Sequence, residues 1–149
     1  YVTSGYDHVG AKLKLNEAGT DVELIWTDDV LDVHHGGAVL VDDHIYGSNW
    51  LNNREGEWCS ISWETGKPSY TTEWNTKGSI IYADGMLYIY EEQRGHVGLV
   101  KPNPEKFELV SSFQITEGVG PHWAHPTIYD GKLLIRHGDV LMVYDIKAG

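Results

Sequence analysis

The sequence predicts an all-β protein made of repeated antiparallel hairpins, and three observations support this fold class. Segments of one pattern begin at Gly36, Gly78 and Ala124, and they read GGAVLVDDHIYGS, GSIIYADGMLYIY and AHPTIYDGKLLIR. Each has two short apolar or β-branched runs around Asp-Asp or Asp-Gly, which is the sequence of a hairpin with a two-residue turn. Glycine and β-branched residues interrupt every window that could form a helix, so we expect no helix longer than a turn or two.

The predicted strands group into four units along the chain. Residues 1–33 contain YVTSGY, AKLKLNEAGT and DVELIW, which fit the last three strands of a unit. Residues 34–76 add WCSISWETGKPSYTTEW to the first hairpin, and residues 77–121 add VGLVKPNPEKFELVSSFQI to the second. Residues 122–149 contain the third hairpin and then VLMVYDIKAG. This count gives roughly fourteen strands.

A repeat of about 40 to 45 residues with four short antiparallel strands is typical of a β-propeller blade. A β-sandwich is the alternative, but its strands have one solvated face and should alternate polar with apolar residues. The runs SIIYADGMLYIY and GKLLI are instead apolar at consecutive positions, which favours strands covered on both faces by neighbouring blades. Propellers close with about four to eight blades, so we interpret the chain as about three and a half blades of a larger ring. The remaining blades would come from elsewhere or from another copy of the chain.

Charge and composition exclude several classes of partner. The chain has 149 residues and a formal net charge of −11, with no basic patch to offset repulsion from a polyanion. Nucleic acid and anionic membrane surfaces are therefore poor candidates as partners. No apolar run of about 18 residues occurs, so no transmembrane segment is expected. The single cysteine, Cys59, is expected to be a half-buried strand residue rather than part of a disulfide or a zinc site.

One stretch carries a family resemblance. SISWETGKPSY, residues 60–70, resembles the tryptophan-docking repeat of propellers of the pyrroloquinoline quinone (PQQ) type, Ala-x-Asp-x-x-Thr-Gly-Lys-x-x-Trp. Thr65, Gly66 and Lys67 match that repeat, whereas Ser60, Ser62 and Tyr70 replace its Ala, Asp and Trp. ADGMLYIY and YDGKLLIRHGDVLMVYDIKAG are similar to the hairpin and third strand of PQQ-binding-like proteins of bacterial envelopes. The resemblance implies the propeller fold and a periplasmic or cell-envelope location.

For activity, the resemblance implies two alternatives. Many PQQ-like propellers bind no cofactor and act as scaffolds or assembly factors, which would make this chain a non-catalytic binding module. The other alternative is an incomplete domain of a quinoprotein-type alcohol or sugar dehydrogenase. Such enzymes carry adjacent cysteines and a Glu, Asn and Asp set for calcium, whereas Cys59 has no cysteine neighbour and no stretch matches the calcium set. We therefore expect no catalytic residue in this chain, and PQQ with calcium only in a full-length protein.

Histidine and tryptophan concentrate at one predicted face. In a propeller, the links between blades and the turns between second and third strands open on the same face, and seven of the eight histidines fall in those segments. Only His44 falls on the opposite face. The predicted ligand-binding face comprises His34, His35, Lys77, His122, Trp123, His125, Arg136 and His137.

Imidazole and indole groups suit a divalent metal, a flat small molecule or a saccharide, and the face could also bind a protein partner. The possible metal ligands are His34, His122 and His125. The alternative is that these side chains only cap strand ends and connect neighbouring blades. Glu91 and Glu92 are interpreted as a solvated loop.

Overall fold

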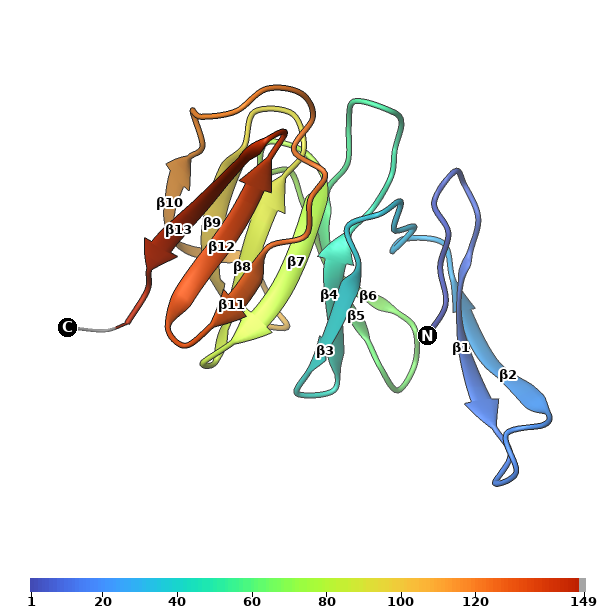
Figure 1. Cartoon of the computed structure of the whole chain (residues 1–149). Coiled ribbons are helices and arrows are strands. Elements are labelled where there is room, and N and C mark those ends of the chain that lie inside the picture. Colours follow the sequence, from blue (N-terminus) through green and yellow to red (C-terminus); the bar gives the residue numbers. More distant parts are fainter. Residues whose placement is uncertain (148–149) are drawn as a thin grey trace.

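The computed structural model describes residues 1–147, which form thirteen β-strands and no helix (Figure 1). Residues 148 and 149, the end of the fourth predicted unit, lie outside the described residues. The strands form four antiparallel sheets, so the all-β prediction is confirmed. Within residues 1–147 there is no helix that could span a membrane.

The first sheet has two strands, β1 (Gly10–Leu15) and β2 (Val22–Asp28). A third strand was predicted in residues 1–6, but Val2 makes only an isolated bridge to Ala11. The backbone at Gly5, Tyr6 and Asp7 has positive φ values of 72, 62 and 60°. Three consecutive left-handed residues cannot continue an extended strand, which is why the described strands number thirteen rather than fourteen.

The other three sheets are meanders in which each strand pairs with the next one along the chain. The second sheet contains β3 (Ala38–Val41), β4 (His44–Ser48), β5 (Trp58–Ser62) and β6 (Pro68–Thr72). The third contains β7 (Gly78–Ala83), β8 (Met86–Glu91), β9 (His96–Lys101) and β10 (Glu108–Gln114). The fourth contains β11 (Thr127–Tyr129), β12 (Lys132–His137) and β13 (Val140–Asp145).

The first turn of each meander has the predicted two-residue form. Asp84 and Gly85 have φ values of 50 and 75°, and Asp130 and Gly131 have values of 45 and 69°. Positive φ at both central residues matches the right-handed twist of the flanking strands, so these turns fix the register of each hairpin. The same conformation holds at the Asp-Asp turn between β3 and β4, where neither residue is a glycine.

Each pair of neighbouring sheets encloses its own hydrophobic core. The core between the first and second sheets contains Leu31, Val33, Ile45, Cys59 and Ile61. The core between the second and third contains Val41, Tyr46, Trp58, Ile80, Leu87, Ile89 and Val100. The core between the third and fourth contains Tyr90, Val97, Ile115, Leu133 and Ile135. Cys59, predicted to be half-buried, is fully buried.

These cores explain the unbroken apolar runs of the sequence. Ile45 of β4 belongs to the core shared with the first sheet, whereas the adjacent Tyr46 belongs to the core shared with the third. Likewise, Ile89 and Tyr90 of β8 belong to different cores. Alternate side chains of one strand point to opposite faces of its sheet, so a strand covered on both faces is apolar at consecutive positions.

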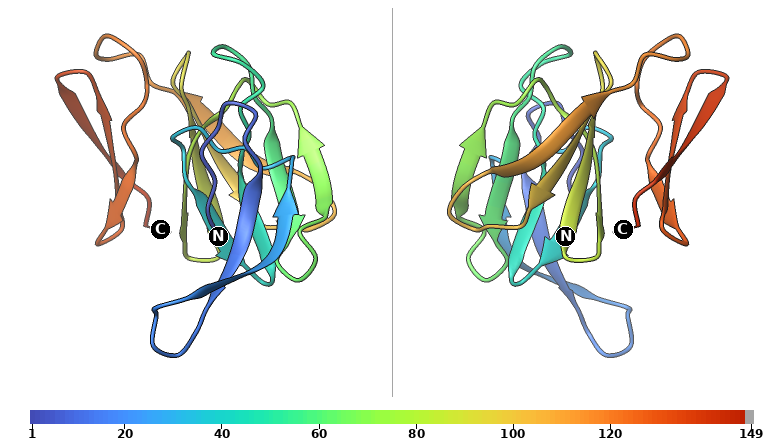
Figure 2. Two further views of the ribbon diagram at one scale, coloured as in Figure 1. Left: turned by 90° about the vertical axis from the view of Figure 1, so that its right-hand side faces the viewer. Right: turned by 90° about the vertical axis from the view of Figure 1, so that its left-hand side faces the viewer.

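The four sheets stand in an open row that follows chain order (Figures 1 and 2). The second and third sheets also meet along β7, the first strand of the third sheet. The amide of Ile80 donates to the carbonyl of Gly36 at 3.1 Å, and the Ser48 hydroxyl donates to the carbonyl of Gly78 at 2.9 Å. A β-carbon on Gly36 would collide with the Gly78 carbonyl, so glycine permits this close approach. Residues 1–147 do not close a ring.

Candidate functional site

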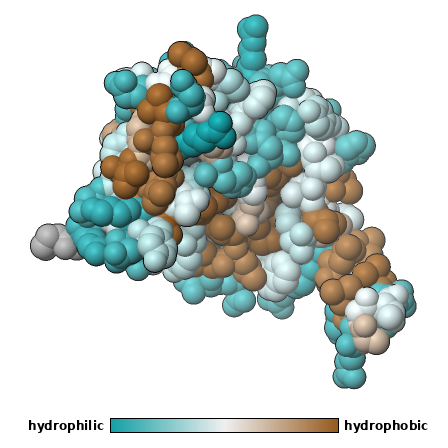
Figure 3. All heavy atoms as spheres, viewed as in Figure 1, coloured by the Kyte–Doolittle hydropathy of each residue, from teal (hydrophilic) through white to brown (hydrophobic). Residues whose placement is uncertain are grey.

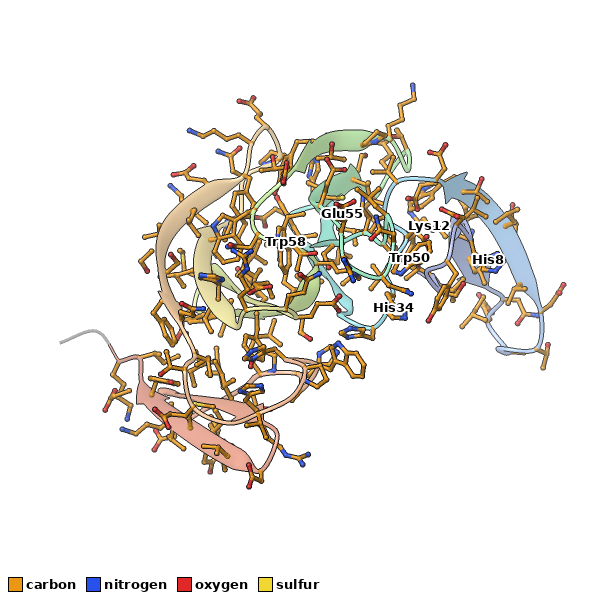
Figure 4. All side chains as sticks on the ribbon, turned by 90° about the horizontal axis from the view of Figure 1, so that it is seen from above. His8, Lys12, His34, Trp50, Glu55 and Trp58 are labelled. Carbon is orange, nitrogen blue, oxygen red and sulfur yellow. The ribbon has the colours of Figure 1, made fainter. Side chains whose placement is uncertain are left out.

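One end of the row of sheets, at the top of Figure 1, carries the links between sheets and the turns between their second and third strands. We call this end the loop face. Figure 4 looks down on it and shows His34 and Trp50 between the β1–β2 hairpin and the second sheet. Most of the predicted site residues lie on this face, because they come from those links and turns.

The densest group of possible ligand atoms on the loop face is formed by His34, His35 and Glu92. One ligand atom from each lies within 4.8 Å of the others, and no other group of this kind exists among residues 1–147. The two histidines lie in the link before β3, followed by two glycines, and Glu92 directly follows β8. Nε2 of His35 is 2.7 Å from Oε2 of Glu92. Two consecutive sheets therefore contribute to one cluster.

Lys77 holds Glu92 in its ionised form. The buried Lys77 ammonium is 2.8 Å from Oε1 of Glu92, and it donates to the carbonyl of Asn52 at 2.8 Å. Burial alone would raise the pKa of Glu92, but hydrogen bonds from His35 and Lys77 outweigh it and lower the pKa below its ordinary value. A buried carboxylate with two charge-assisted partners is stable only as long as both remain in place.

The surroundings of His34 favour its neutral form, and one of its two ring nitrogens has no hydrogen-bond partner among the described residues. Burial, and then the neighbouring His35, lowers the pKa of His34 below its ordinary value. Its Nε2 lies 2.8 Å from the Tyr6 hydroxyl. Its Nδ1 is buried with no hydrogen-bond partner among the described residues. The unprotonated nitrogen of a neutral imidazole can accept a hydrogen bond or coordinate a metal ion.

Aromatic side chains surround this cluster. Tyr6 packs edge-on against the ring of His34, with 4.8 Å between ring centroids, and also contacts Trp50. The Trp123 indole packs edge-on against the ring of His35, with 5.9 Å between ring centroids, and Trp123 is 58% exposed. Nε2 of His125 bonds to the backbone carbonyl of His35 at 2.8 Å. The cluster is thus bordered by aromatic rings, of which those of Tyr6 and Trp123 are more than half exposed.

A second pair of histidines, His122 and His137, is separate from this cluster. Their rings stack with centroids 3.7 Å apart, and both residues are buried. Burial, and then His137, lowers the pKa of His122. The hydroxyl of Tyr90 is hydrogen-bonded to Nδ1 of His122 at 2.5 Å. Both nitrogens of His137 lie 2.7 Å from backbone carbonyls of the link before β11, so this pair connects the third and fourth sheets.

The structure therefore divides the predicted site residues into two groups. His34, His35 and Lys77 come together, with Trp123 and His125 beside them. His122 and His137 form the buried pair, and the exposed Arg136 bonds through Nε to the carbonyl of Gly138 in its own turn. Of the three predicted metal ligands, His34 lies in the ligand cluster, whereas the ring nitrogens of His122 and His125 bond to Tyr90 and to the His35 backbone.

The interpretation of Glu91 and Glu92 as a solvated loop was wrong. Glu91 is 0% exposed and Glu92 is 5% exposed. Glu91 accepts hydrogen bonds from the amides of Gln93, Arg94 and His96 and so closes the turn between β8 and β9. One signal in the sequence points to the role of Glu92: the Asp84-Gly85 turn sets a register that places Glu92 opposite Lys77.

Chemically, the cluster combines two imidazoles with an ionised carboxylate, a ligand set that suits Zn²⁺ and Ni²⁺. The ammonium of Lys77 competes for the same carboxylate, so metal affinity depends on how well the metal displaces that contact. No known family model matches the chain, and no curated protein matches it significantly.

Proposed function

We propose that the chain is an arc of a PQQ-like β-propeller and acts as a non-catalytic binding module. The second and third sheets support the propeller, because each has four strands in the same order and the first strands of both are in contact. The three separate inter-sheet cores support it further, since blades of a propeller pack face to face.

A docking contact between the first two units fits the same proposal. Trp26 of β2 lies over Gly66 in the turn between β5 and β6, so closely that a β-carbon there would be 2.7 Å from the indole ring. The Trp26 indole also donates to the carbonyl of Trp63 at 3.2 Å. Gly66 belongs to the stretch that resembles the tryptophan-docking repeat, so one unit docks on the repeat of the next.

The function rests on one observation, the cluster of His34, His35 and Glu92. We assign it the binding of a divalent transition metal ion, with the aromatic rings of the loop face available to a metal-bound or flat ligand. Binding is favoured over catalysis because the contacts with His35 and Lys77, at 2.7 and 2.8 Å, lower the pKa of Glu92 and keep it ionised, which suits a ligand better than a proton donor. The family resemblance supports a location in the bacterial envelope, with further blades or another copy of the chain completing the ring.

Calorimetric titration with Zn²⁺ at about pH 7.5 and about pH 5.5 tests this proposal. Metal binding needs unprotonated imidazoles, so the affinity should fall as the pH drops through about 6.5. His35→Ala should weaken binding at least about tenfold, because one of three ligands is lost. His44→Ala is the matched control and should leave binding unchanged. His44 begins β4 at the β3–β4 turn, which is the end of this hairpin opposite to the link that carries His34 and His35. Equal loss from both substitutions, or no binding by the parent, would contradict the assignment.

A further inference from the structure

The last strand of the fourth sheet, β13, has an unpaired edge. It pairs with β12 along one edge, and along the other edge it has no partner among residues 1–147. The amide of Ile146, just after β13, donates to the carbonyl of Gly131 on the β12 side at 2.9 Å. The backbone groups of successive residues point to alternate edges of a strand. The amides and carbonyls of Leu141, Val143 and Asp145 therefore face the unpaired edge.

The sequence of β13 is that of an inner strand. The last strands of the first three sheets, β2, β6 and β10, read VELIWTD, PSYTT and ELVSSFQ, and the pairing of each with its neighbour contains a register shift. Polar residues, proline and bulges of this kind protect a sheet edge against further pairing. β13 reads VLMVYD and pairs with β12 without a shift. This lack of protection is typical of a strand that has a neighbour on both edges.

An apolar cavity lies between the third and fourth sheets. It has a volume of about 240 Å³, and its walls include Leu99, Ser111 and Phe113 of the third sheet. Leu133 of β12 and Ile146, just after β13, form its other side. The third sheet has a fourth strand, β10, whereas the described part of the fourth sheet ends at β13. The cavity therefore lies where a fourth strand of the last sheet would pack against β9 and β10.

The equivalent space between the second and third sheets is almost filled. Tyr46 and Leu87 line it, in the strand positions that Tyr88 and Leu133 occupy at the apolar cavity, and only about 10 Å³ remains empty. Phe107, the residue just before β10, packs against this core and lines the remaining space. An aromatic side chain at the start of a fourth strand thus fills the gap between these two sheets. The fourth sheet lacks the strand that would carry such a side chain.

We propose that the unpaired edge of β13 binds an extended segment of a partner polypeptide, which adds a fourth antiparallel strand and places an aromatic side chain in the apolar cavity. Only a polypeptide backbone offers the row of amides and carbonyls that this edge requires, and β6 and β10 pair in the same way. The net charge of −11 favours a segment that is neutral or basic. The inference depends on different residues from the proposed metal site, so failure of one leaves the other intact.

Fluorescence anisotropy with a labelled, end-blocked peptide of residues 106–114, KFELVSSFQ, tests the inference, because this segment forms a fourth strand in the third sheet. Alanine in place of Phe107 should weaken binding at least about tenfold, since the cavity is then left empty. Alanine in place of Phe113 should weaken it less than about threefold. Phe113 contacts the following sheet rather than the preceding one, so its counterpart in an added strand faces away from the cavity. Equal losses from the two changes, or no saturable binding of the parent peptide, would overturn the proposal.

Variants of the protein locate the binding. Val143→Pro removes an amide that faces the unpaired edge and keeps the pairing with β12, so peptide binding should fall at least about tenfold. Ser111→Phe fills the cavity from an exposed position of β10 and should cause a loss of the same size. Ser111→Thr is the matched control and should leave binding unchanged. Unchanged binding in Ser111→Phe, with the folded state verified by thermal unfolding, would overturn the proposal even if Val143→Pro failed to fold.

Amide hydrogen exchange measured by NMR distinguishes an added strand from other apolar binding. The bound peptide should slow exchange at Leu141 and Val143 at least about tenfold more than at Met142 and Tyr144, whose amides point toward β12. Slowing without this alternation would overturn the proposal. Self-association that the peptide abolishes would show that a second copy of the chain occupies this edge, and would overturn it as well.

Discussion

Lys77 and Glu92 show how a single buried ion pair can both stabilise the loop face and restrain its chemistry. The Lys77 ammonium bonds to Glu92 and to the carbonyls of Asn52 and Glu55. This side chain therefore connects the loop between β4 and β5 to the end of β8. Because the ammonium also neutralises a metal-ligand oxygen, stability and metal affinity should change in opposite directions when Lys77 is replaced.

Lys77→Met should lower the free energy of unfolding by about 3 kcal/mol, since Glu92 would keep a buried charge with only His35 as its partner. The same substitution should increase the rise in Tm on adding Zn²⁺, because the carboxylate is then free for the metal. Thermal unfolding with and without Zn²⁺ measures both effects. Lys12→Met is the matched control, since Lys12 bonds to the carbonyl of Trp63, a residue outside the cluster. An equal Zn²⁺ effect in the parent and Lys77→Met would contradict the assigned site.

The lowered pKa values of His34 and His122 give a pH dependence with a definite sign. Both rings are harder to protonate in the folded chain than in the unfolded chain, so their contribution to stability is present above about pH 6.5 and is lost as the pH falls below it. Glu92 contributes to stability in the same direction but at lower pH. Because its pKa is lowered from 4.5, its contribution is present above about pH 4.5 and is lost as the pH falls below it. Urea unfolding at about pH 7.5 and about pH 5.5 should show a smaller loss of stability for His122→Gln than for the parent. A loss as large as in the parent would contradict the buried, neutral state of His122.

The sequence identifies histidines of the loop face but not the residue that connects them. His34 and His35 are recognisable because two adjacent histidines precede a predicted hairpin. Glu92 is much harder to recognise, because an acidic pair after a strand is usually solvated and its one signal is the hairpin register that places it opposite Lys77. Its burial depends on Lys77, which faces it across the β7–β8 hairpin, and on a contact with the preceding sheet. Only the packing of two sheets brings His35 and Glu92 together.

At the scale of the strands, local turn chemistry explains most of the successful predictions. Asp84-Gly85 and Asp130-Gly131 define hairpins whose register follows from the turn alone. Residues 1–6 were predicted as a strand from composition, yet positive φ at Gly5, Tyr6 and Asp7 ends pairing after one bridge. Gly5 and Asp7 are residue types that adopt such a conformation readily, but Tyr6 between them rarely does, so the sequence did not indicate a run of three left-handed residues that ends the strand.

Two glycines allow the docking of one sheet on the next to be measured. Gly66 and Gly85 have almost the same φ, 71 and 75°, but only Gly66 faces a neighbouring ring, that of Trp26. Gly85→Ala should cost about 1 kcal/mol for the left-handed backbone alone. Gly66→Ala should cost about 1–3 kcal/mol more, because the added methyl displaces Trp26. Equal costs in urea unfolding would show that Trp26 does not dock on this turn.

At the scale of the whole molecule, the two end sheets leave apolar surface in contact with solvent. Figure 3 shows hydrophobic surface on the β1–β2 hairpin and on the last sheet. Val22 and Leu24 of β2 are more than half exposed, as are Leu141 and Val143 of β13. In the proposed propeller, further blades cover these faces.

The isolated chain should therefore self-associate through these faces. Light scattering coupled to gel filtration over a range of concentrations should give a mass that rises with concentration. Replacing Leu24 and Val143 with Lys should reduce this association, while Leu51→Lys, an exposed change in the loop between β4 and β5, should not. A monodisperse monomer at every concentration would contradict the view that these end faces pack against further blades.

The most direct measurement is side-chain ¹⁵N NMR of the eight histidines during titration with Zn²⁺. The central claim is that links from consecutive sheets form one binding face whose metal ligands are His34, His35 and Glu92. The ring resonances of His34 and His35 should then change first, while those of His44 and the buried His122 stay in place. Simultaneous changes in His44 and His35, or no change in any histidine ring, would contradict the claim.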